Sequence, residues 1–261
     1  MSEEKMILTE RRGDVLIITL DRPDRLNAAP PVMFDRVREV LDDLSGARAV
    51  LLRGEGRAFC SGADVAGGAL GSDDPQAATY KALTEHYNPT LKAIAELQVP
   101  VVSAVRGPAA GIGCSLALSA DFCIAASSAY FLQAFVNIGL VPDGGASWML
   151  PRIIGRSRAL EMMMLGERVP AERALEWGLV HRLVADDVLD DQAFALAERL
   201  AAGPTVALGL MRRNVAYALE HSYDEAMLRE AESQRDVRGT SDAMEGGRAF
   251  LEKREAEFSG R

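Results

Sequence analysis

Short apolar runs alternate with longer amphipathic stretches through the first half of the chain. The β-branched run from Val15 to Leu20 ends at the breaker sequence Asp21-Arg22-Pro23-Asp24, which predicts a buried strand. Apolar residues then recur at helical spacing from Met33 to Leu44, before Ser45-Gly46 closes the predicted helix. Val50 to Leu52 predicts the next strand. This alternation of strand and helix indicates an α/β core.

The alternation continues to about residue 125. A helical stretch from Ala78 to Leu97 precedes a strand at Val101 to Val105. Small and apolar residues from Gly111 to Ala120 predict a tightly packed helix that leads into a strand at Phe122 to Ala125. Beyond about residue 157 the pattern predicts helices almost without strands, at 157–165, 171–177, 188–202, 205–219, 223–237 and 240–253. We therefore expect an α/β core followed by a helical C-terminal part.

One predicted C-terminal helix, from Thr205 to Ala218, is apolar on much of its circumference. Its apolar positions include Val206, Leu208, Leu210, Met211 and Val215. Packing against the core and contact with a second subunit both account for such a helix. The pattern alone leaves the two alternatives open.

Composition argues against several classes of function. No apolar run approaches the roughly 20 residues that cross a bilayer, and the first fifteen residues lack a signal-peptide core, so we expect a soluble, cytoplasmic protein with no membrane segment. The formal net charge of −9, with scattered lysine and arginine, argues against a nucleic-acid partner. The three cysteines, Cys60, Cys114 and Cys123, are too widely spaced for a disulfide framework or a zinc site, so we expect buried reduced thiols. The three histidines, His86, His181 and His221, share no metal-ligand spacing, so we expect no metal site.

Two glycine-bearing segments each follow a buried strand and precede a helix. The first runs from Gly56 to Asp64 and the second from Gly107 to Cys114. Glycine lets the backbone adopt unusual torsions and approach a ligand closely, and the first amides of a helix point outward unpaired. Such turns are also common as purely structural features, and neither segment matches a P-loop or a dinucleotide fingerprint. Each segment by itself is weak evidence for a ligand site.

Five ordered motifs together resemble the crotonase (enoyl-CoA hydratase/isomerase) superfamily over essentially the whole chain. They are Leu20 to Ala28, which looks like the first segment that contacts coenzyme A, Gly56 to Asp64 and Ala104 to Gly113, which look like the two oxyanion segments, Gly139 to Gly145, and Phe250 to Arg254. The resemblance implies an α/β fold with a crotonase (ClpP-like) ββα spiral core in residues 1–200, which would bind acyl-CoA. Residues 201–261 would form a helical trimerisation region.

The resemblance also assigns roles to single residues. The amide groups of Ala63 and Ile112 would form an oxyanion hole around the thioester carbonyl, where removal of a neighbouring proton places negative charge. Residues that match substrate or coenzyme A contacts are Arg25, Leu26, Ala28, Ser61, Gly62, Ala63, Asp64, Val65, Gly111, Ile112, Phe135, Phe250 and Lys253. Helix capping by Asp64, core packing by Phe135 and a solvated terminal helix for Phe250 and Lys253 are the structural alternatives. Coenzyme A would enter as part of the substrate, without a separate cofactor, and a homotrimer or hexamer is implied.

The chain departs from the hydratase pattern at two positions. Hydratases of this superfamily use two glutamates, and the matching positions here are Ser115 and Phe135, neither of which can act as a carboxylate. Asp143 supplies a different acid. Without context, an aspartate between Pro142 and Gly144 is a turn or helix-capping residue. The run from Gly139 to Pro151, however, resembles the isomerase subgroup, in which the matching aspartate or a nearby glutamate is the acid/base.

These departures favour an acyl-CoA isomerase that shifts a double bond, of the Δ3 to Δ2 type or the ring-oxepin type. One carboxylate suffices because a single base can take a proton from C2 and return it to C4. A largely apolar pocket would raise the pKa of Asp143 toward a useful value. The alternatives are a hydratase with a non-standard acid/base and a non-catalytic acyl-CoA-binding protein.

Overall fold

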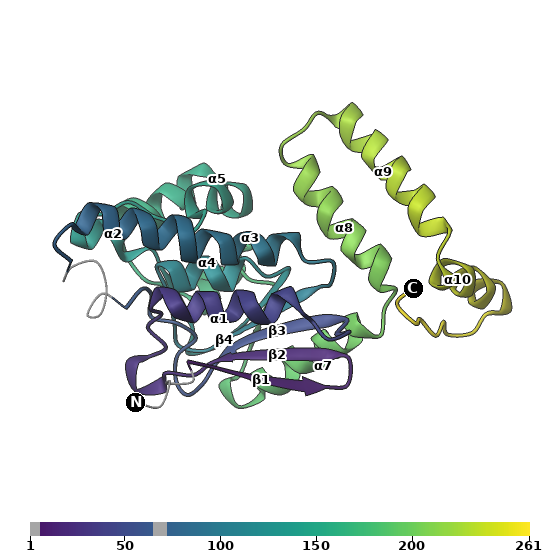
Figure 1. Ribbon diagram of the computed structural model, residues 1–261, viewed down its shortest axis with the longest axis horizontal. Coiled ribbons are helices and arrows are strands. Elements are labelled where there is room, and N and C mark those ends of the chain that lie inside the picture. Colours follow the sequence, from purple (N-terminus) through teal and green to yellow (C-terminus); the bar gives the residue numbers. More distant parts are fainter. Residues whose placement is uncertain (1–5, 65–71) are drawn as a thin grey trace.

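The computed structural model describes residues 6–64 and 72–261, and within them six strands form the main sheet (Figure 1). The first two strands pair antiparallel, and every later pairing in this sheet is parallel. In sheet order the strands are β1 (Ile7–Arg12), β2 (Val15–Leu20), β3 (Ala49–Gly54), β4 (Val101–Val105), β6 (Phe122–Ala126) and β9 (Arg182–Val184).

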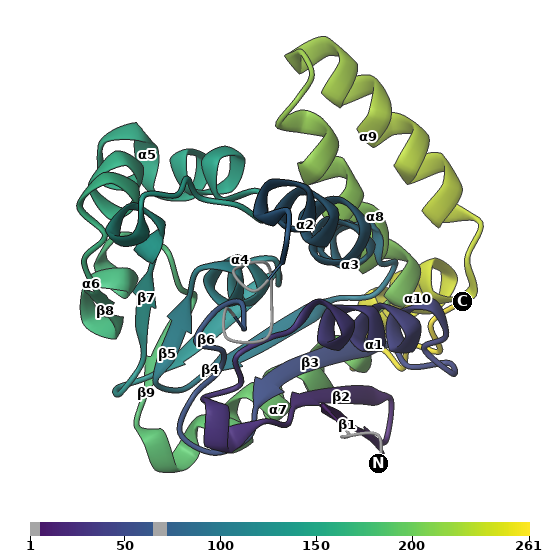
Figure 2. The same ribbon diagram turned by 60° about the vertical axis from the view of Figure 1, so that its left-hand side comes forward.

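A second, three-stranded sheet lies beside β4 and β6 (Figure 2). It consists of β5 (Pro108–Ala110), β7 (Tyr130–Leu132) and β8 (Val169–Pro170). The strand β4 thus continues into β5, and β6 into β7, before the chain turns into a helix. This repeat belongs to the ββα spiral that the family resemblance implied.

The inner strands β2, β3, β4 and β6 are largely buried on both faces, which is why they are nearly continuous apolar runs. On one face Leu16 and Ile18 pack toward α1 (Pro31–Asp42), α3 (Asn88–Glu96) and α4 (Ile112–Leu118). On the other face Val15 and Ile17 pack against α7 (Leu189–Ala201). Successive side chains of a strand point to opposite faces, so each strand contributes to both layers.

The predicted helix from Ala78 to Leu97 contains a widened turn. It consists of α2 (Pro75–Lys81), the π-helical turn η4 (Ala82–Tyr87) and α3. Pro89 lacks an amide hydrogen and its ring would clash with the carbonyl of Glu85 in a regular helix. Arg38 donates to that carbonyl oxygen instead, at 3.5 Å. The π turn brings Tyr87 to the inner side of the helix, where it is 4% exposed.

Several short elements escape the sequence pattern. The strand β1 is exposed at five of its six residues, and β5, β7, β8 and β9 have only two or three residues each. The helix expected from residue 157 begins earlier, as α5 (Ala146–Leu165), and bends at Gly155, where φ is +77°. The other short helical elements of the described core are η1 (Pro23–Arg25), η5 (Ala134–Ile138), α6 (Ala171–Glu176) and η6 (Asp186–Val188).

Three helices extend from the core at the C-terminal end (Figure 1). They are α8 (Thr205–Ala218), α9 (Tyr223–Arg238) and α10 (Ser241–Glu252). Several contacts hold α8 to the core. Among them, Arg212 binds both carboxylate oxygens of Asp121 at 2.7 and 2.6 Å, and Gly209 passes so close to Gln98 that a Cβ there would lie 2.3 Å from the Gln98 carbonyl oxygen. The expected division at residue 200 falls at the last turn of α7.

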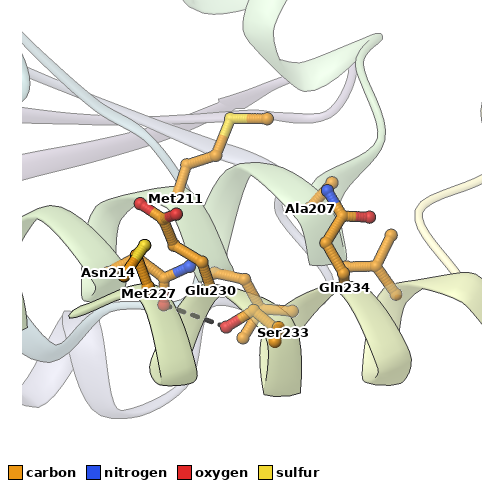
Figure 3. Close-up of a pocket in the computed structure, with 10 residues that line it drawn as sticks. Ala207, Met211, Asn214, Met227, Glu230, Ser233 and Gln234 are labelled. Atoms are coloured by element: carbon orange, nitrogen blue, oxygen red, sulfur yellow. Dashed lines mark hydrogen bonds between the residues drawn. The ribbon is translucent and has the colours of Figure 1, made fainter. Parts of the chain in front are cut away.

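The apolar helix α8 does not pack as a core helix. Only Gly209 and Leu210 of this helix are buried, whereas Met211 and Val215 are 59% and 64% exposed. A groove of about 460 Å³ lies between α8 and α9, with Met211 and Met227 on its walls and a hydrogen bond of 2.9 Å from Ser233 Oγ to Asn214 Oδ1 (Figure 3). Of the two alternatives for this helix, exposure favours contact with a second subunit.

No single helix in residues 6–64 and 72–261 is long and apolar enough to cross a membrane. Two consecutive helices, 186–201 and 205–218, reach the length and apolar composition of a membrane span only when they are taken together, and they are bent by 105°. The first helix of this pair includes α7, which packs beneath the main sheet.

Candidate active site

The two glycine-bearing segments lie side by side at the carboxyl ends of the parallel strands of the main sheet. They follow β3 and β4, which are parallel neighbours, so their carboxyl ends meet there. Cys60 joins the segments, since its amide donates to Pro108 O at 3.0 Å and its carbonyl accepts from Ala110 N at 2.9 Å. A Cβ on Gly113 would lie 2.5 Å from the carbonyl oxygen of Cys60, so this approach requires glycine. Burial raises the pKa of the Cys60 thiol to about 12, in keeping with the predicted buried thiol.

The backbone around Ala63 turns its amide toward a cavity. Ala29 N donates to Gly62 O at 2.8 Å, and Asp64 N donates to Ala29 O at 3.0 Å. These bonds make Ala63 the middle residue of a parallel bridge to Ala29, so the N–H of Ala63 points away from its partner strand. No acceptor in the described parts of the chain takes this N–H, and Ala63 lines the cavity.

Ile112 supplies a second free amide. It is the first residue of α4 and follows Gly111, whose φ is +53°. The first amides of a helix have no partner within the helix, and among residues 6–64 and 72–261 none accepts from Ile112 N. A Cβ at position 111 would lie 4.0 Å from the Cα of Gly62. The turns that carry the two free amides are therefore in contact, as an oxyanion hole requires.

A cavity of about 330 Å³ opens beside these amides, between α2, η4 and η5. Its walls are mainly apolar, with Leu83, Ile112, Phe135 and Leu140 among them. The polar residues that line it are Ser61, Asp64, Thr79, Tyr87, Asn137 and Asp143. Such a chamber suits an apolar acyl group attached to one polar reacting centre.

Asp143 places its carboxyl group in this cavity, and the carboxylate does not cap a helix. The next helix, α5, has Gly145 at its N-cap and no side-chain cap bond; it is the backbone carbonyl of Asp143 that accepts from Ala146 N, at 3.1 Å. Burial raises the pKa of Asp143 to about 6. Its Oδ1 is buried and has no hydrogen-bond partner within the described residues. A partly buried carboxylate with one unpartnered oxygen and this pKa is suited to proton transfer at neutral pH.

Asp64, the other carboxylate on the cavity wall, is held in an ion pair. Arg22 Nη1 lies 2.8 Å from its Oδ2, and the two side chains are only 11% and 17% exposed. Arg22 also donates to the carbonyl oxygen of Ala28. The expected capping role of Asp64 concerns the residues that follow it directly, 65–71, which lie outside the described residues; α2, the first helix described after them, is capped by Asp74. Through Arg22, Asp64 fastens the segment before α1 to the first oxyanion turn.

Tyr87 lines the cavity but received no role in the sequence analysis. Its hydroxyl donates to Ala29 O at 2.8 Å, and its ring packs edge-on against Phe34. Burial raises the pKa of Tyr87, and the nearby charges of Asp143 and Asp64 raise it further. Pro89, two residues later and incompatible with a regular helix here, is the sequence signal that could have pointed to this inward residue.

The remaining expected site residues divide between the cavity and more distant places. Ser61 lines the cavity, and its amide and hydroxyl donate to the carbonyls of Leu26 at 3.0 Å and Arg25 at 3.4 Å. Arg25, Leu26 and Ala28 thus form the loop that supports the first oxyanion turn. Val65 lies outside the described residues. Within one chain, α10 carries Phe250 and Lys253 away from the cavity, and Phe250 is 83% exposed.

Further observations concern metal binding and the two positions where hydratases carry a glutamate. No group of three or more histidine, cysteine, aspartate or glutamate side chains in residues 6–64 and 72–261 could hold a metal ion. Ser115 is fully buried, and its hydroxyl donates to the carbonyl oxygen of Asp143 at 3.2 Å. Phe135, at the other position where hydratases carry a glutamate, lies on the cavity wall, with its ring edge 3.4 Å from the position that a Cβ on Gly111 would take.

Comparison with known proteins identifies this arrangement. The sequence profile of the enoyl-CoA hydratase/isomerase family matches residues 10–261. The chain belongs to this family. It therefore has the crotonase fold that its five motifs predicted, and the family acts on acyl-CoA thioesters.

Similar proteins carry both family names. The chain is 38% identical to a 1,2-epoxyphenylacetyl-CoA isomerase from Escherichia coli K12, over 98% of this chain and 99% of the relative. It is 41% identical to a probable enoyl-CoA hydratase from Rhodobacter capsulatus, over 94% of each chain. A crystal structure of enoyl-CoA hydratase from Bacillus anthracis superposes with a TM-score of 0.92 at 29% identity, over 98% of this chain and 100% of that one. These relatives establish an enzyme of the hydratase/isomerase family.

Proposed function

We propose that this enzyme is an acyl-CoA isomerase that moves a double bond from the Δ3 to the Δ2 position of an unsaturated acyl group. The observation that carries the proposal is that Asp143, Ala63 and Ile112 line one cavity. A carboxylate and two free amides are the groups that proton transfer next to a thioester requires. The ring-containing substrate named for the Escherichia coli relative is the candidate variant of this chemistry.

The reaction needs one base and one anion site. The Asp143 carboxylate takes a proton from C2, and the electron pair left behind is delocalised onto the thioester oxygen as a dienolate. The N–H groups of Ala63 and Ile112 donate to that oxygen and stabilise its charge, a contribution of roughly 3–4 kcal/mol for one donor in other enzymes. The protonated Asp143 then returns the proton to C4, and the double bond re-forms between C2 and C3. No atoms are gained or lost.

The acidity of Asp143 supports both halves of this transfer. With a pKa of about 6, most of the carboxylate is ionised at neutral pH and can accept a proton. Its conjugate acid is strong enough to give that proton back, and general acid/base catalysis is most effective when the pKa lies near the working pH. The apolar wall of the cavity limits the access of water to the dienolate.

The pattern of carboxylates favours isomerisation over hydration. Water addition in this family uses two glutamates, and Ser115 and Phe135 stand at those positions. The described cavity wall carries two carboxylates, and Asp64 is engaged by Arg22. A hydratase function is the second candidate because of the Rhodobacter capsulatus relative, and it would have to recruit Asp64 as the partner of Asp143.

The deciding experiment compares the wild type with Asp143→Asn on a 3-enoyl-CoA and on crotonyl-CoA in ¹⁸O-labelled water. We expect conjugated product from the first substrate, no labelled 3-hydroxyacyl product from the second, and a loss of at least about 10²-fold in isomerase turnover in the variant. Asp187→Asn, at an exposed aspartate, is the control with unchanged turnover. A loss of less than about threefold in folded Asp143→Asn would overturn the assignment, and labelled hydroxyacyl product would favour the hydratase.

We also propose that the C-terminal helices bind further copies of the chain, as a trimer or hexamer. Leu251 and Phe250 of α10 are 82% and 83% exposed, and α8 and α9 expose further apolar residues beside their groove (Figure 3). Burial of these residues would remove an apolar surface that monomers rarely expose. In such an assembly Phe250 and Lys253 would contact coenzyme A in the cavity of another subunit, which is consistent with their distance from the cavity of their own chain.

A further inference from the structure

The first turn of α4 carries two contacts that bear on catalysis. Ile112 presents its free amide at one end, and three residues later the hydroxyl of Ser115 donates to the Asp143 carbonyl oxygen at 3.2 Å. Residues three apart lie on the same side of a helix. One helical turn therefore connects the proposed oxyanion donor with the backbone of the proposed base.

The carboxylate of Asp143 depends on its backbone for its position. Its Oδ1 has no hydrogen-bond partner within the described residues, so that atom does not fix the side-chain direction. Two glycines follow, with φ of +58° at Gly144 and +80° at Gly145, and glycine adds little stiffness of its own. What fixes the backbone here is the carbonyl of Asp143, which accepts from Ser115 Oγ and from Ala146 N.

The segment also fits closely against α4. A Cβ on Gly144 would lie 2.6 Å from Ile112 Cδ1 and 2.8 Å from Ser115 Cβ. A side chain much larger than serine at position 115, such as the glutamate of a hydratase, would compete for the space that Gly144 occupies. A small residue at 115 and a glycine at 144 together let Asp143 come this close to the oxyanion donor.

We infer that Ser115 is a positioning residue that holds Asp143 at a fixed place relative to the Ile112 amide. Its hydroxyl anchors the Asp143 backbone, and its small size admits Gly144. The loss of the hydratase glutamate at this position is, in this view, what makes room for an acid from another segment. The inference rests on the proposed function for its catalytic consequence, and on the hydrogen bond and close packing for its structural basis.

The test is Ser115→Ala, which removes the hydroxyl and keeps the small volume. We expect kcat of the isomerase reaction to fall about tenfold, with KM within about twofold, because a displaced base affects the transition state more than binding. The acidic limb of the kcat profile should shift to lower pH, because a looser Asp143 is better hydrated and its pKa falls. A merely structural serine would change stability without shifting this limb.

Ser119→Ala is the matched control. Ser119 lies at the end of the same helix, and its hydroxyl donates locally to Leu116 O at 2.7 Å, without contact to Asp143. This variant should keep the wild-type kcat and the wild-type pH profile. Ser115→Cys, which has a similar size and a weaker donor, serves if Ser115→Ala does not fold, and it should show smaller changes in the same direction.

A readout independent of turnover separates this inference from the proposed function. An NMR titration with ¹³C-labelled aspartate, assigned with Asp143→Asn, should show the Asp143 pKa lower in Ser115→Ala than in the wild type. An unchanged kcat, acidic limb and NMR pKa in folded Ser115→Ala would overturn the inference even if Asp143→Asn were inactive. If Asp143→Asn kept its turnover, the proposed function would fail, and the NMR shift alone would still decide whether Ser115 positions Asp143.

Discussion

The hydroxyl of Tyr87 donates to the carbonyl oxygen of Ala29 at 2.8 Å, and the same oxygen accepts from Asp64 N at 3.0 Å. Ala29 is the bridge partner of Ala63, so this carbonyl lies directly behind the amide that we propose as the first oxyanion donor. The widened turn η4 thus contributes both a wall of the cavity and a support for the proposed anion site.

Removal of this hydroxyl should weaken catalysis more than binding. In Tyr87→Phe the ring and the wall remain, but a buried carbonyl loses one donor, which costs about 1 kcal/mol of folding stability. We expect kcat to fall three- to tenfold with little change in KM. Steady-state kinetics and thermal unfolding measure both effects, and Tyr80→Phe, at a 71% exposed tyrosine of α2, is the control. Equal kcat in Tyr87→Phe and Tyr80→Phe would contradict this role.

The ion pair between Arg22 and Asp64 should contribute more to stability than exposed pairs of the same length. Removing one partner leaves a largely desolvated charge, so Arg22→Met or Asp64→Asn alone should cost about 2–3 kcal/mol, and the double variant less than the sum. The pair between Arg173 and Glu161 has the same 2.8 Å separation but side chains 49% and 38% exposed. Its removal should cost under about 1 kcal/mol. Urea unfolding of both sets of variants provides the comparison, and equal losses would refute the argument from burial.

Among the strands, the sequence predicted those that are buried on both sides and missed those that are not. β2 and β4 have the predicted bounds because every residue of each is buried, which produces an unbroken apolar run. β1 escapes because only Ile7 is partly buried and its remaining side chains face solvent. A three-residue strand such as β7 is too short for any period to show. The hydrophobic pattern of a strand therefore reflects its burial. An edge strand that is held mainly by backbone pairing has no such pattern.

The same distinction applies to the site. The turns around Ala63 and Ile112 were predictable because each needs glycines at fixed local positions, and the family resemblance supplied their roles. The contact between Ser115 and Asp143 was not predictable, because 28 residues separate the two and neither has a local signature. Side-chain contacts between distant segments depend on the fold and follow from it only once the segments are placed.

The exposed apolar face of α8 leads to a prediction about assembly. Met211 and Val215 lie one turn apart on this face, so Met211→Glu combined with Val215→Glu would place two charges in any interface that covers it. Light scattering should show an oligomer for the wild type and a lower mass for the double variant. Arg213→Glu, an exposed change on the same helix, should leave the mass unchanged. An identical mass for wild type and double variant would place the subunit contact elsewhere.

The raised pKa of Asp143 predicts that activity and stability depend on this residue in opposite ways. Its folded-state pKa of about 6 lies above the ordinary value of 3.8, so the folded protein prefers the protonated form. The stability that this group contributes is fully present below the unfolded pKa and is lost as pH rises through about 6, because the ionised carboxylate remains desolvated. A difference of about two pKa units corresponds to up to about 3 kcal/mol. At pH 8 Asp143→Asn should therefore be inactive and yet unfold at a higher temperature than the wild type, whereas at pH 4 the two should unfold at similar temperatures. Calorimetry at both pH values measures these differences in unfolding temperature. A lower unfolding temperature for Asp143→Asn than for the wild type at pH 8 would contradict the prediction, because it would show that the surroundings stabilise the ionised carboxylate.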